Sequence, residues 1–368
     1  MRIVYVLTSL GMGGAERQVL ALGERMAARG HTVSLLILRP PLAEEWPTRL
    51  GVFHLDMRRN PLAVLRAVAR GRRFLAQLQP QIVHSHGFHG NIMARLFHAL
   101  AIATAPISTI HNVYEGGHAR MLSYRMTDPL SRITTAVSAV AAERFIKARA
   151  MPASKSIVLT NGIDSTEFAP SQERRDRIRF DMQVTGEFVW LAAGRIVPAK
   201  NYPNLLRAFA NVHAAFPSAQ LWIAGEGSDA ESPRLRELAT ELGLGDQLRW
   251  LGLRRDLPAL LDAADAFVLS SAWEGMPLAA GEAMSMEKPV VATDVGGLRE
   301  LIGDAGILVP PSDAAALADA MISLMNLPEE NRLALGRSAR ERIVSNFDID
   351  ARAAEWEILY QRILDSNI

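Results

Sequence analysis

One stretch of the chain combines two carboxylates with the expected start of a helix. Residues 270–282 (SSAWEGMPLAAGE) carry Glu274 in a loop and Glu282 about one turn into the helix expected after Pro277. The N–H groups and the dipole of a helix N-terminus bind anions, and proline suits a first helical turn. The N–H groups that can point outward here belong to Gly275, Met276 and Leu278. The stretch predicts carboxylates that bind ligand hydroxyls beside a helix end that binds phosphate, although either glutamate alone also fits a helix cap or a surface acid.

Two basic residues follow another expected strand. Gly194-Arg195 leaves an apolar segment, and Lys200 comes five residues after Arg195. Arginine offers a planar fork for phosphate oxygens and lysine a mobile point charge, so both can reach one diphosphate. A basic pair is usually a solvated surface feature. However, Lys200 is the only lysine between residues 155 and 288 and is expected on a ligand-binding loop, which favours the diphosphate.

Two glycine clusters follow expected strands and could also bind phosphate at a helix N-terminus. In residues 11–16 (GMGGAE), Glu16 stands where a dinucleotide fingerprint needs Gly or Ala. Residues 225–230 (GEGSDA) fit G-x-G-x-x-A, which is a weak signal alone and equally fits a tight strand-to-helix turn. The chain has no G-x-x-x-x-G-K-[ST] motif, so a P-loop ATPase is not expected.

Short apolar runs alternate with helical patterns along the whole chain. Runs without polar alternation indicate strands covered on both faces, which is typical of a parallel sheet with crossover helices. The first set of expected elements comprises strands at 2–8, 32–38, 81–85, 106–110, 133–137 and 157–159, and helices at 13–29, 61–78 and 90–101. The pattern restarts with strands at 187–193, 219–224, 248–251, 266–269 and 289–292, and is helical from Ser312 with breaks near Pro328 and 346–348. We expect an α/β fold of two doubly wound Rossmann-like domains that bind ligands in a cleft at the carboxyl ends of their strands.

Composition limits the classes of protein to consider. With 368 residues, 49% of them hydrophobic, and no cysteine, the chain suggests two domains and excludes global disorder, disulfides and cysteine nucleophiles. Residues 1–163 hold 20 Lys+Arg against 8 Asp+Glu, whereas the remainder has a net charge of −11. The basic half favours an anionic partner such as membrane headgroups, a lipid phosphate or nucleic acid, unless the two halves neutralise each other. No signal or membrane-spanning segment is visible, so we expect a soluble, cytoplasmic protein.

The basic half contains one amphipathic segment. Residues 61–74 (PLAVLRAVARGRRF) set apolar positions against arginines, with Arg58 and Arg59 just before them. Such a segment suits the surface of an anionic membrane, here the inner face of the cytoplasmic membrane, or is an ordinary exposed helix.

An ordered set of motifs resembles the retaining, nucleotide-sugar-dependent glycosyltransferases of the GT-B class called family 4 or group 1. The resemblance covers nearly the whole chain. Its motifs are Gly13-Gly14-Ala15-Glu16, His84-Ser85-His86-Gly87, Thr109-Ile110-His111, Val137-Ser138, Asn161-Gly162-Ile163-Asp164, Gly194-Arg195 with Lys200, and Glu274 with Glu282.

The resemblance implies a role for each site residue. Arg195 and Lys200 would hold the diphosphate of a donor such as a UDP- or GDP-sugar, and Glu282 the ribose hydroxyls. Glu274 and the amides of Gly275, Met276 and Leu278 would contact the sugar, near which Gly14 would bring its backbone. His111 would act near the reacting sugar together with Glu274, which we interpret as a sugar binder and not a nucleophile. His86 would face the acceptor.

The resemblance also implies the chemistry and the domain plan. Positive side chains and helix ends stabilise a leaving diphosphate without a metal, and we expect no two-aspartate metal clamp. The expected enzyme is a hexosyltransferase acting on a hydroxyl of a lipid-linked saccharide or polysaccharide precursor, as in lipopolysaccharide and cell-envelope synthesis. Residues 1–163 would form the acceptor-side domain and 164–346 the donor-binding domain, with a last helix at 350–366 packing back on the first.

Two alternatives remain open at this point. A nucleotide-sugar epimerase or hydrolase on the same fold would consume donor equally with or without an acceptor. A non-catalytic binder of sugar nucleotides would not turn over, and a nucleic-acid binder is disfavoured because the basic half lacks interleaved exposed aromatics.

Overall fold

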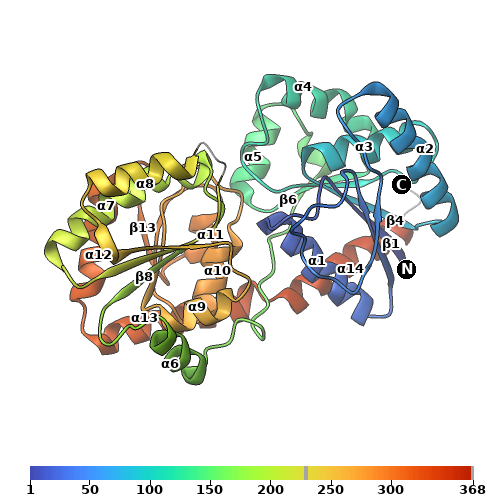
Figure 1. Ribbon diagram of the computed structural model, residues 1–368. Helices are drawn as coiled ribbons and strands as arrows, with labels where there is room; N and C mark the ends of the chain where they lie inside the picture. Colours follow the sequence, from blue (N-terminus) through green and yellow to red (C-terminus); the bar gives the residue numbers. More distant parts are fainter. Residues whose placement is uncertain (228–230, 366–368) are drawn as a thin grey trace. The chain divides into compact units, whose positions relative to one another are not determined.

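The computed structural model describes residues 1–227 and 231–365, which divide into two compact units (Figure 1). The first unit comprises Met1–Gly162 together with the chain from Ile349 onward, and the second comprises Ile163–Asp348. Each unit is built on one parallel sheet with helices on both faces. The expected α/β class, with two Rossmann-like domains, is confirmed.

The first unit contains a seven-stranded parallel sheet with the strand order β3-β2-β1-β4-β5-β6-β7. Its strands are β1 (Arg2–Leu7), β2 (Thr32–Ile37), β3 (Gly51–His54), β4 (Ile82–His86), β5 (Ile107–Ile110), β6 (Ile133–Ala136) and β7 (Ser156–Val158). Its helices are α1 (Gly14–Ala28), α2 (Pro61–Leu78), α3 (Gly87–Ala99), α4 (His118–Thr127), α5 (Ala139–Lys147) and α14 (Ile349–Asp365). The short elements β3, α4 and α5 were not predicted from the sequence.

Local sequence explains where two of these helices begin. The side chain of Asn60 accepts a hydrogen bond from the Ala63 N–H and Pro61 occupies the first turn, so α2 begins at Pro61. The Ser138 hydroxyl accepts one from the Ala141 N–H in the same way at the start of α5.

The two faces of the first sheet have separate cores, because successive residues of a buried strand point to opposite sides. On one face, Ile3 and Tyr5 of β1 pack with α1 and with Trp356 and Tyr360 of α14. On the other face, Val4 and Val6 pack with α2 and α3. Figure 1 shows α14, in red, beside α1, in blue; Arg25 of α1 is 3.1 Å from Asp350 of α14.

The second unit contains a six-stranded parallel sheet with the order β10-β9-β8-β11-β12-β13. Its strands are β8 (Val189–Ala193), β9 (Gln220–Ala224), β10 (Leu248–Gly252), β11 (Ala266–Leu269), β12 (Val290–Thr293) and β13 (Ile307–Val309). Its helices are α6 (Gln172–Asp181), α7 (Tyr202–Ala215), α8 (Glu231–Glu241), α9 (Leu257–Ala263), α10 (Leu278–Ser285), α11 (Leu298–Ile302), α12 (Ala314–Asn326) and α13 (Glu329–Asn346). The strand β13 was not predicted.

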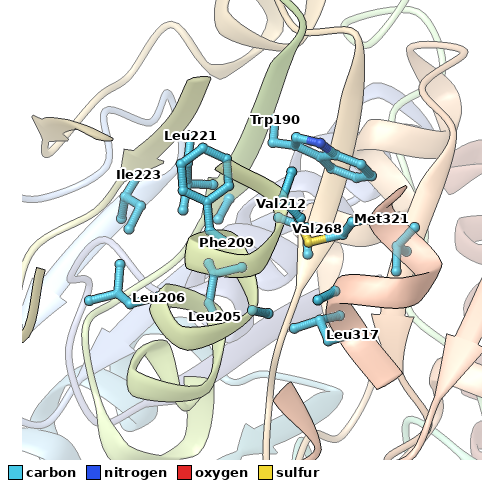
Figure 2. Packing of buried hydrophobic residues seen from close by; sticks show 14 of the residues in the cluster. Trp190, Leu205, Leu206, Phe209, Val212, Leu221, Ile223, Val268, Leu317 and Met321 are labelled. Atoms are coloured by element: carbon cyan, nitrogen blue, oxygen red, sulfur yellow. The ribbon is translucent and has the colours of Figure 1, made fainter. Parts of the chain in front are cut away.

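One core of the second unit lies between its sheet and the helices α7, α8 and α12 (Figure 2). Trp190 and Leu221 from the sheet meet Phe209 of α7 and Met321 of α12, and all four are fully buried. This packing fixes the strand ends from which the candidate donor residues emerge.

Candidate functional site

The strand order of the second unit reverses between β8 and β11, and ligands of doubly wound sheets bind at such a point. The loop after β8 carries Arg195 and Lys200, and the loop after β11 carries Glu274. The neighbouring strands are paired from Ala266↔Trp190 onward, so both loops leave the same edge of the sheet. The two sequence-predicted clusters thus meet at one place.

Lys200 and Glu274 form a direct ion pair at this edge. The Lys200 Nζ lies 2.6 Å from Glu274 Oε1, and the two side chains are 17% and 10% exposed. The Ser271 hydroxyl donates to the same carboxylate oxygen at 2.7 Å. A buried charge pair needs such extra hydrogen bonds to offset its desolvation.

Hydrogen bonds hold the two loops to each other and to the sheet. The Ser270 hydroxyl donates to the Lys200 carbonyl at 2.9 Å, and the Ala272 N–H donates to the Ala199 carbonyl at 2.8 Å. The Tyr202 hydroxyl donates to the Gly194 carbonyl at 2.9 Å. Burial, and secondarily the Glu274 charge, raises the pKa of Tyr202 well above its usual range, so the hydroxyl keeps its proton.

Two close backbone approaches require glycine beside these loops. Gly296 has φ +56°, and a Cβ there would lie 2.1 Å from the Glu274 carbonyl oxygen, so only glycine lets the neighbouring loop support Glu274. Gly225 has φ +156°, and its Cβ would lie 1.9 Å from the Gly194 oxygen. This supports the tight-turn interpretation of the 225–230 cluster, of which residues 228–230 lie outside the described structure.

The other residues that were expected to contact the donor differ in their exposure to solvent. Arg195 is exposed, and its side chain has no hydrogen-bond or ion-pair partner among the residues that the structure describes. Glu282 lies within α10 and is only 5% exposed. Gly275, Met276 and Leu278 precede or begin α10, whose first N–H groups lack intrahelical acceptors. Gly14 of the first unit is exposed at the N-terminus of α1.

In the first unit, whose strand order reverses between β1 and β4, His84 and His86 lie on β4 and His111 directly follows the neighbouring β5. His84 and His86 alternate along β4 and so lie on the face covered by α14. His84 Nδ1 is 2.7 Å from the Tyr360 hydroxyl, and His84 Nε2 is 2.6 Å from Thr109 Oγ1. The ring centroids of His84 and His86 are 4.0 Å apart.

His86 and His111, both predicted from the sequence, contact each other. His86 Nδ1 lies 3.0 Å from His111 Nε2, and His86 is only 6% exposed. Burial lowers the pKa of His111 to about 4, and burial followed by the charges of neighbouring histidines lowers that of His86 well below its usual range. Both rings are therefore neutral at pH 7. The acceptor-facing role expected for His86 stays a prediction.

Glu115 was not predicted from the sequence as a site residue. Its Oε1 accepts the backbone N–H of His111 at 3.0 Å, and its Oε2 accepts the Tyr124 hydroxyl at 2.5 Å. Burial raises the pKa of Glu115, although these hydrogen bonds oppose the shift. A single acid in a loop forms no sequence pattern that could have indicated this role.

The sequence does contain one Asp-x-Asp triplet, Asp348-Ile349-Asp350, although no two-aspartate metal clamp was expected. Its two aspartates lie in different units, where Asp348 accepts a hydrogen bond from Ser165 and Asp350 pairs with Arg25. Within residues 1–227 and 231–365, no group of three or more His, Asp or Glu is arranged to hold a metal ion.

Two family models match successive parts of the chain. The family described as Glycosyltransferase Family 4 matches residues 12–167, and Glycosyl transferases group 1 matches residues 174–342. The chain is 27% identical over 303 residues to UDP-Gal:alpha-D-GlcNAc-diphosphoundecaprenol alpha-1,3-galactosyltransferase of Escherichia coli, covering 78% of this chain and 77% of the relative. It is 28% identical over 383 aligned residues to glycogen synthase of Mycobacterium tuberculosis H37Rv, covering 92% and 88%.

The fold is also that of a solved structure. HepE of Anabaena, crystallised in complex with UDP and glucose, superposes with a TM-score of 0.85 at 20% identity, covering 98% of this chain and 99% of that chain. The two Rossmann-like units together with this likeness define the GT-B fold. The chain belongs to the group 1 and family 4 glycosyltransferases and is an enzyme of the hexosyltransferase type.

Proposed function

We propose that this enzyme is a retaining, metal-independent glycosyltransferase that uses a nucleoside-diphosphate sugar, with UDP- or GDP-sugars as the first candidates. We further propose that its acceptor is a hydroxyl group of a lipid-linked saccharide or polysaccharide precursor. The observation that carries the proposal is the Lys200–Glu274 ion pair at the strand-order reversal of the second unit, with Arg195 on the same loop as Lys200.

The charges of this cluster match the needs of the donor. Cleavage of a glycosyl–phosphate bond leaves negative charge on the diphosphate and positive charge on the sugar. Arg195 and Lys200 supply cations for the diphosphate, and the N-terminus of α10 supplies N–H groups and the positive end of a helix dipole. Glu282 is proposed to bind the ribose, and Glu274 the sugar.

Retention is proposed to need no nucleophile from the protein. The acceptor hydroxyl oxygen bonds to the anomeric carbon on the face from which the diphosphate leaves, and the hydroxyl proton passes to the departing phosphate oxygen. His111 is proposed to act on the sugar as the bond breaks. Relatives named for a lipid-linked diphosphate acceptor and for glycogen support the proposed acceptor classes.

A donor screen tests the proposal directly. UDP, GDP and ADP are compared by thermal shift and calorimetry, and the matching sugar nucleotides are then assayed with and without lipid-linked acceptors. Acceptor-dependent turnover that survives a chelator, with unchanged anomeric configuration by proton NMR, is the expected result. Equal donor consumption without acceptor would instead support a hydrolase or epimerase, and inversion would overturn the retaining mechanism.

The outer face of α2 supports a proposed contact with an anionic membrane surface. Leu62 and Leu65 are 56% and 67% exposed, and α2 contains no acidic residue. The exposed arginines on and before this helix are Arg58, Arg59, Arg66, Arg72 and Arg73. Apolar side chains between arginines bind headgroups and the acyl boundary together. No helix in residues 1–227 or 231–365 has the length and hydropathy to cross a bilayer.

Vesicle sedimentation tests this contact. Wild-type enzyme should bind phosphatidylglycerol vesicles but not phosphatidylcholine vesicles, and Leu62→Ser/Leu65→Ser should reduce binding. The matched control is Leu333→Ser, which changes a leucine that is 53% exposed in the second unit. Equal sedimentation of all three proteins on both vesicles would exclude the α2 face as a membrane contact.

A further inference from the structure

We infer that His86 is a positioning residue that orients the His111 imidazole and keeps the His111 proton on Nδ1. The inference deepens the proposed function, because it concerns how His111 would meet the donor sugar. It rests on the hydrogen bond between the two rings and on the surroundings of His86.

The hydrogen bond requires one of two tautomer pairs. His86 Nδ1 and His111 Nε2 are 3.0 Å apart, and a neutral imidazole carries its proton on only one nitrogen. Either His86 donates from Nδ1, which leaves the His111 proton on Nδ1, or His111 donates from Nε2, which leaves the His86 proton on Nε2.

The other ring nitrogen of His86 decides between these pairs. His86 Nε2 is buried and has no hydrogen-bond partner in the part of the chain that the structure describes. Protons placed there would be buried donors without an acceptor, and orphaned buried N–H groups are rarer than under-satisfied acceptors. The structure therefore favours a proton on His86 Nδ1, donated to His111 Nε2.

The surroundings prevent either ring from turning freely. The His86 ring packs against two rings that also contact each other: Tyr5, with centroids 5.6 Å apart, and His84, with centroids 4.0 Å apart. His84 is itself fixed by Tyr360 and Thr109. The backbone of His111 is fixed by Glu115, which accepts its N–H at 3.0 Å. His111 is thus held by its main chain and by Nε2.

This arrangement determines whether the second ring nitrogen of His111, Nδ1, donates or accepts a hydrogen bond. Its Nδ1 has no hydrogen-bond partner within the described residues, and with the proton on Nδ1 this atom is a neutral donor. A neutral donor suits an oxygen of the sugar, and it adds no positive charge near a sugar that becomes cationic as the bond breaks.

The tautomers are read directly by long-range proton–nitrogen NMR of the ring nitrogens, with His111 assigned by comparison with His111→Asn. In the wild-type enzyme, we expect protonated Nδ1 and bare Nε2 on both histidines. A His111 protonated on Nε2 overturns the inference, whatever the activity of the enzyme.

Two variants of His86 test its effect on turnover. His86→Asn keeps an amide near the place of Nδ1, whereas His86→Phe keeps an aromatic ring beside Tyr5 and His84 without a nitrogen. We expect the Phe variant to lose turnover by about tenfold, the worth of one hydrogen bond, with unchanged nucleotide affinity, and the Asn variant to recover most of that loss.

The outcomes separate the inference from the proposed function. Normal turnover in a folded His86→Phe enzyme, or equal losses in both variants, overturns the positioning role. If the wild-type enzyme binds no nucleoside diphosphate, the proposed function fails, and the NMR spectrum still decides the tautomer. Melting temperatures of both variants show whether a loss of turnover reflects loss of folded protein.

Discussion

Lys200 Nζ lies 2.6 Å from Glu274 Oε1, and this ion pair joins the loop after β8 to the loop after β11. The sequence predicted the lysine as a phosphate ligand and the glutamate as a sugar ligand, on separate grounds. Because the two side chains pair with each other, a donor that binds to both must share or replace the ion pair between them. If the two residues bind the diphosphate and the sugar as proposed, recognition of these two parts of the donor is coupled.

The pair makes a prediction about stability. Lys200→Met leaves the Glu274 carboxylate, 10% exposed, without its cation, and should lower the free energy of unfolding by about 1–3 kcal/mol. Lys200→Met/Glu274→Gln removes both charges and should recover part of that loss. Urea denaturation of the two variants measures both effects. A double variant that is no more stable than Lys200→Met would contradict the expected recovery.

The proposed binding of the diphosphate by Arg195 and Lys200 predicts an effect on affinity. Removing one charge-assisted hydrogen bond costs about 1.5–3 kcal/mol, so Arg195→Ala and Lys200→Ala should each weaken nucleoside-diphosphate binding about tenfold to a hundredfold. Calorimetry with UDP or GDP gives the dissociation constants. The exposed Arg207 on α7 provides the control Arg207→Ala, which should bind normally. Unchanged affinity in both site variants would remove these residues from the donor site.

The sequence predicted the positions of strand ends better than the partners of the side chains that follow them. Apolar runs such as Arg2–Leu7 are buried on both faces, so hydrophobicity alone predicted the parallel sheets. The weak strand Gly51–His54 was missed because it is half exposed at the sheet edge and lacks a continuous apolar run.

The side-chain contacts of the site depend on tertiary structure that no local pattern specifies. Lys200 and Glu274 are far apart in the sequence and meet only because β8 and β11 are neighbours. Tyr360 reaches His84 only because α14 returns to the first unit. Glu115 was missed because a single acid in a loop has no pattern until its hydrogen bonds to His111 and Tyr124 are known.

The proposed binding of the ribose by Glu282 can be tested by altering the ligand as well as the protein. If its carboxylate binds the ribose, wild-type enzyme should bind UDP at least about tenfold more tightly than 2′,3′-dideoxy-UDP. Glu282→Ala should bind UDP more weakly and should not distinguish the two ligands. Calorimetric titration of both proteins with both ligands completes the cycle. Full discrimination in the Glu282→Ala enzyme would assign ribose recognition to another residue.

The proposed role of His111 predicts an effect on turnover and little effect on nucleotide affinity. Stabilisation confined to the transition state appears in kcat, so His111→Ala should lower turnover while nucleotide affinity changes little. A purely structural role would instead lower the melting temperature and leave the turnover of the folded protein nearly normal. Turnover, affinity and melting temperature are measured on the same preparation. Near-normal turnover would exclude His111 from catalysis.

The three histidines should make the stability of the first unit depend on pH. Burial, with neighbouring histidine charges in second place, lowers the pKa of His84 and His86 well below 6.5, and burial lowers that of His111 to about 4. Between the folded and unfolded pKa values, the unfolded chain binds more protons. The stability contributed by the neutral rings is therefore complete above pH 6.5 and is lost progressively as the pH falls below it, down to about pH 4 for His111.

Each histidine can contribute at most about 1.4 kcal/mol per pH unit over that interval, and Glu115, whose pKa is raised, acts in the opposite direction at the acid end. Hydrogen exchange of peptides from β4 and β5 at about pH 7.5 and about pH 5 should show opening of the first unit at the lower pH. His111→Asn should flatten this dependence, whereas His118→Asn, at an exposed position of α4, should not. Equal protection of β4 at both pH values, after correction for intrinsic exchange, would mean that the histidine cluster does not control the acid stability of this sheet.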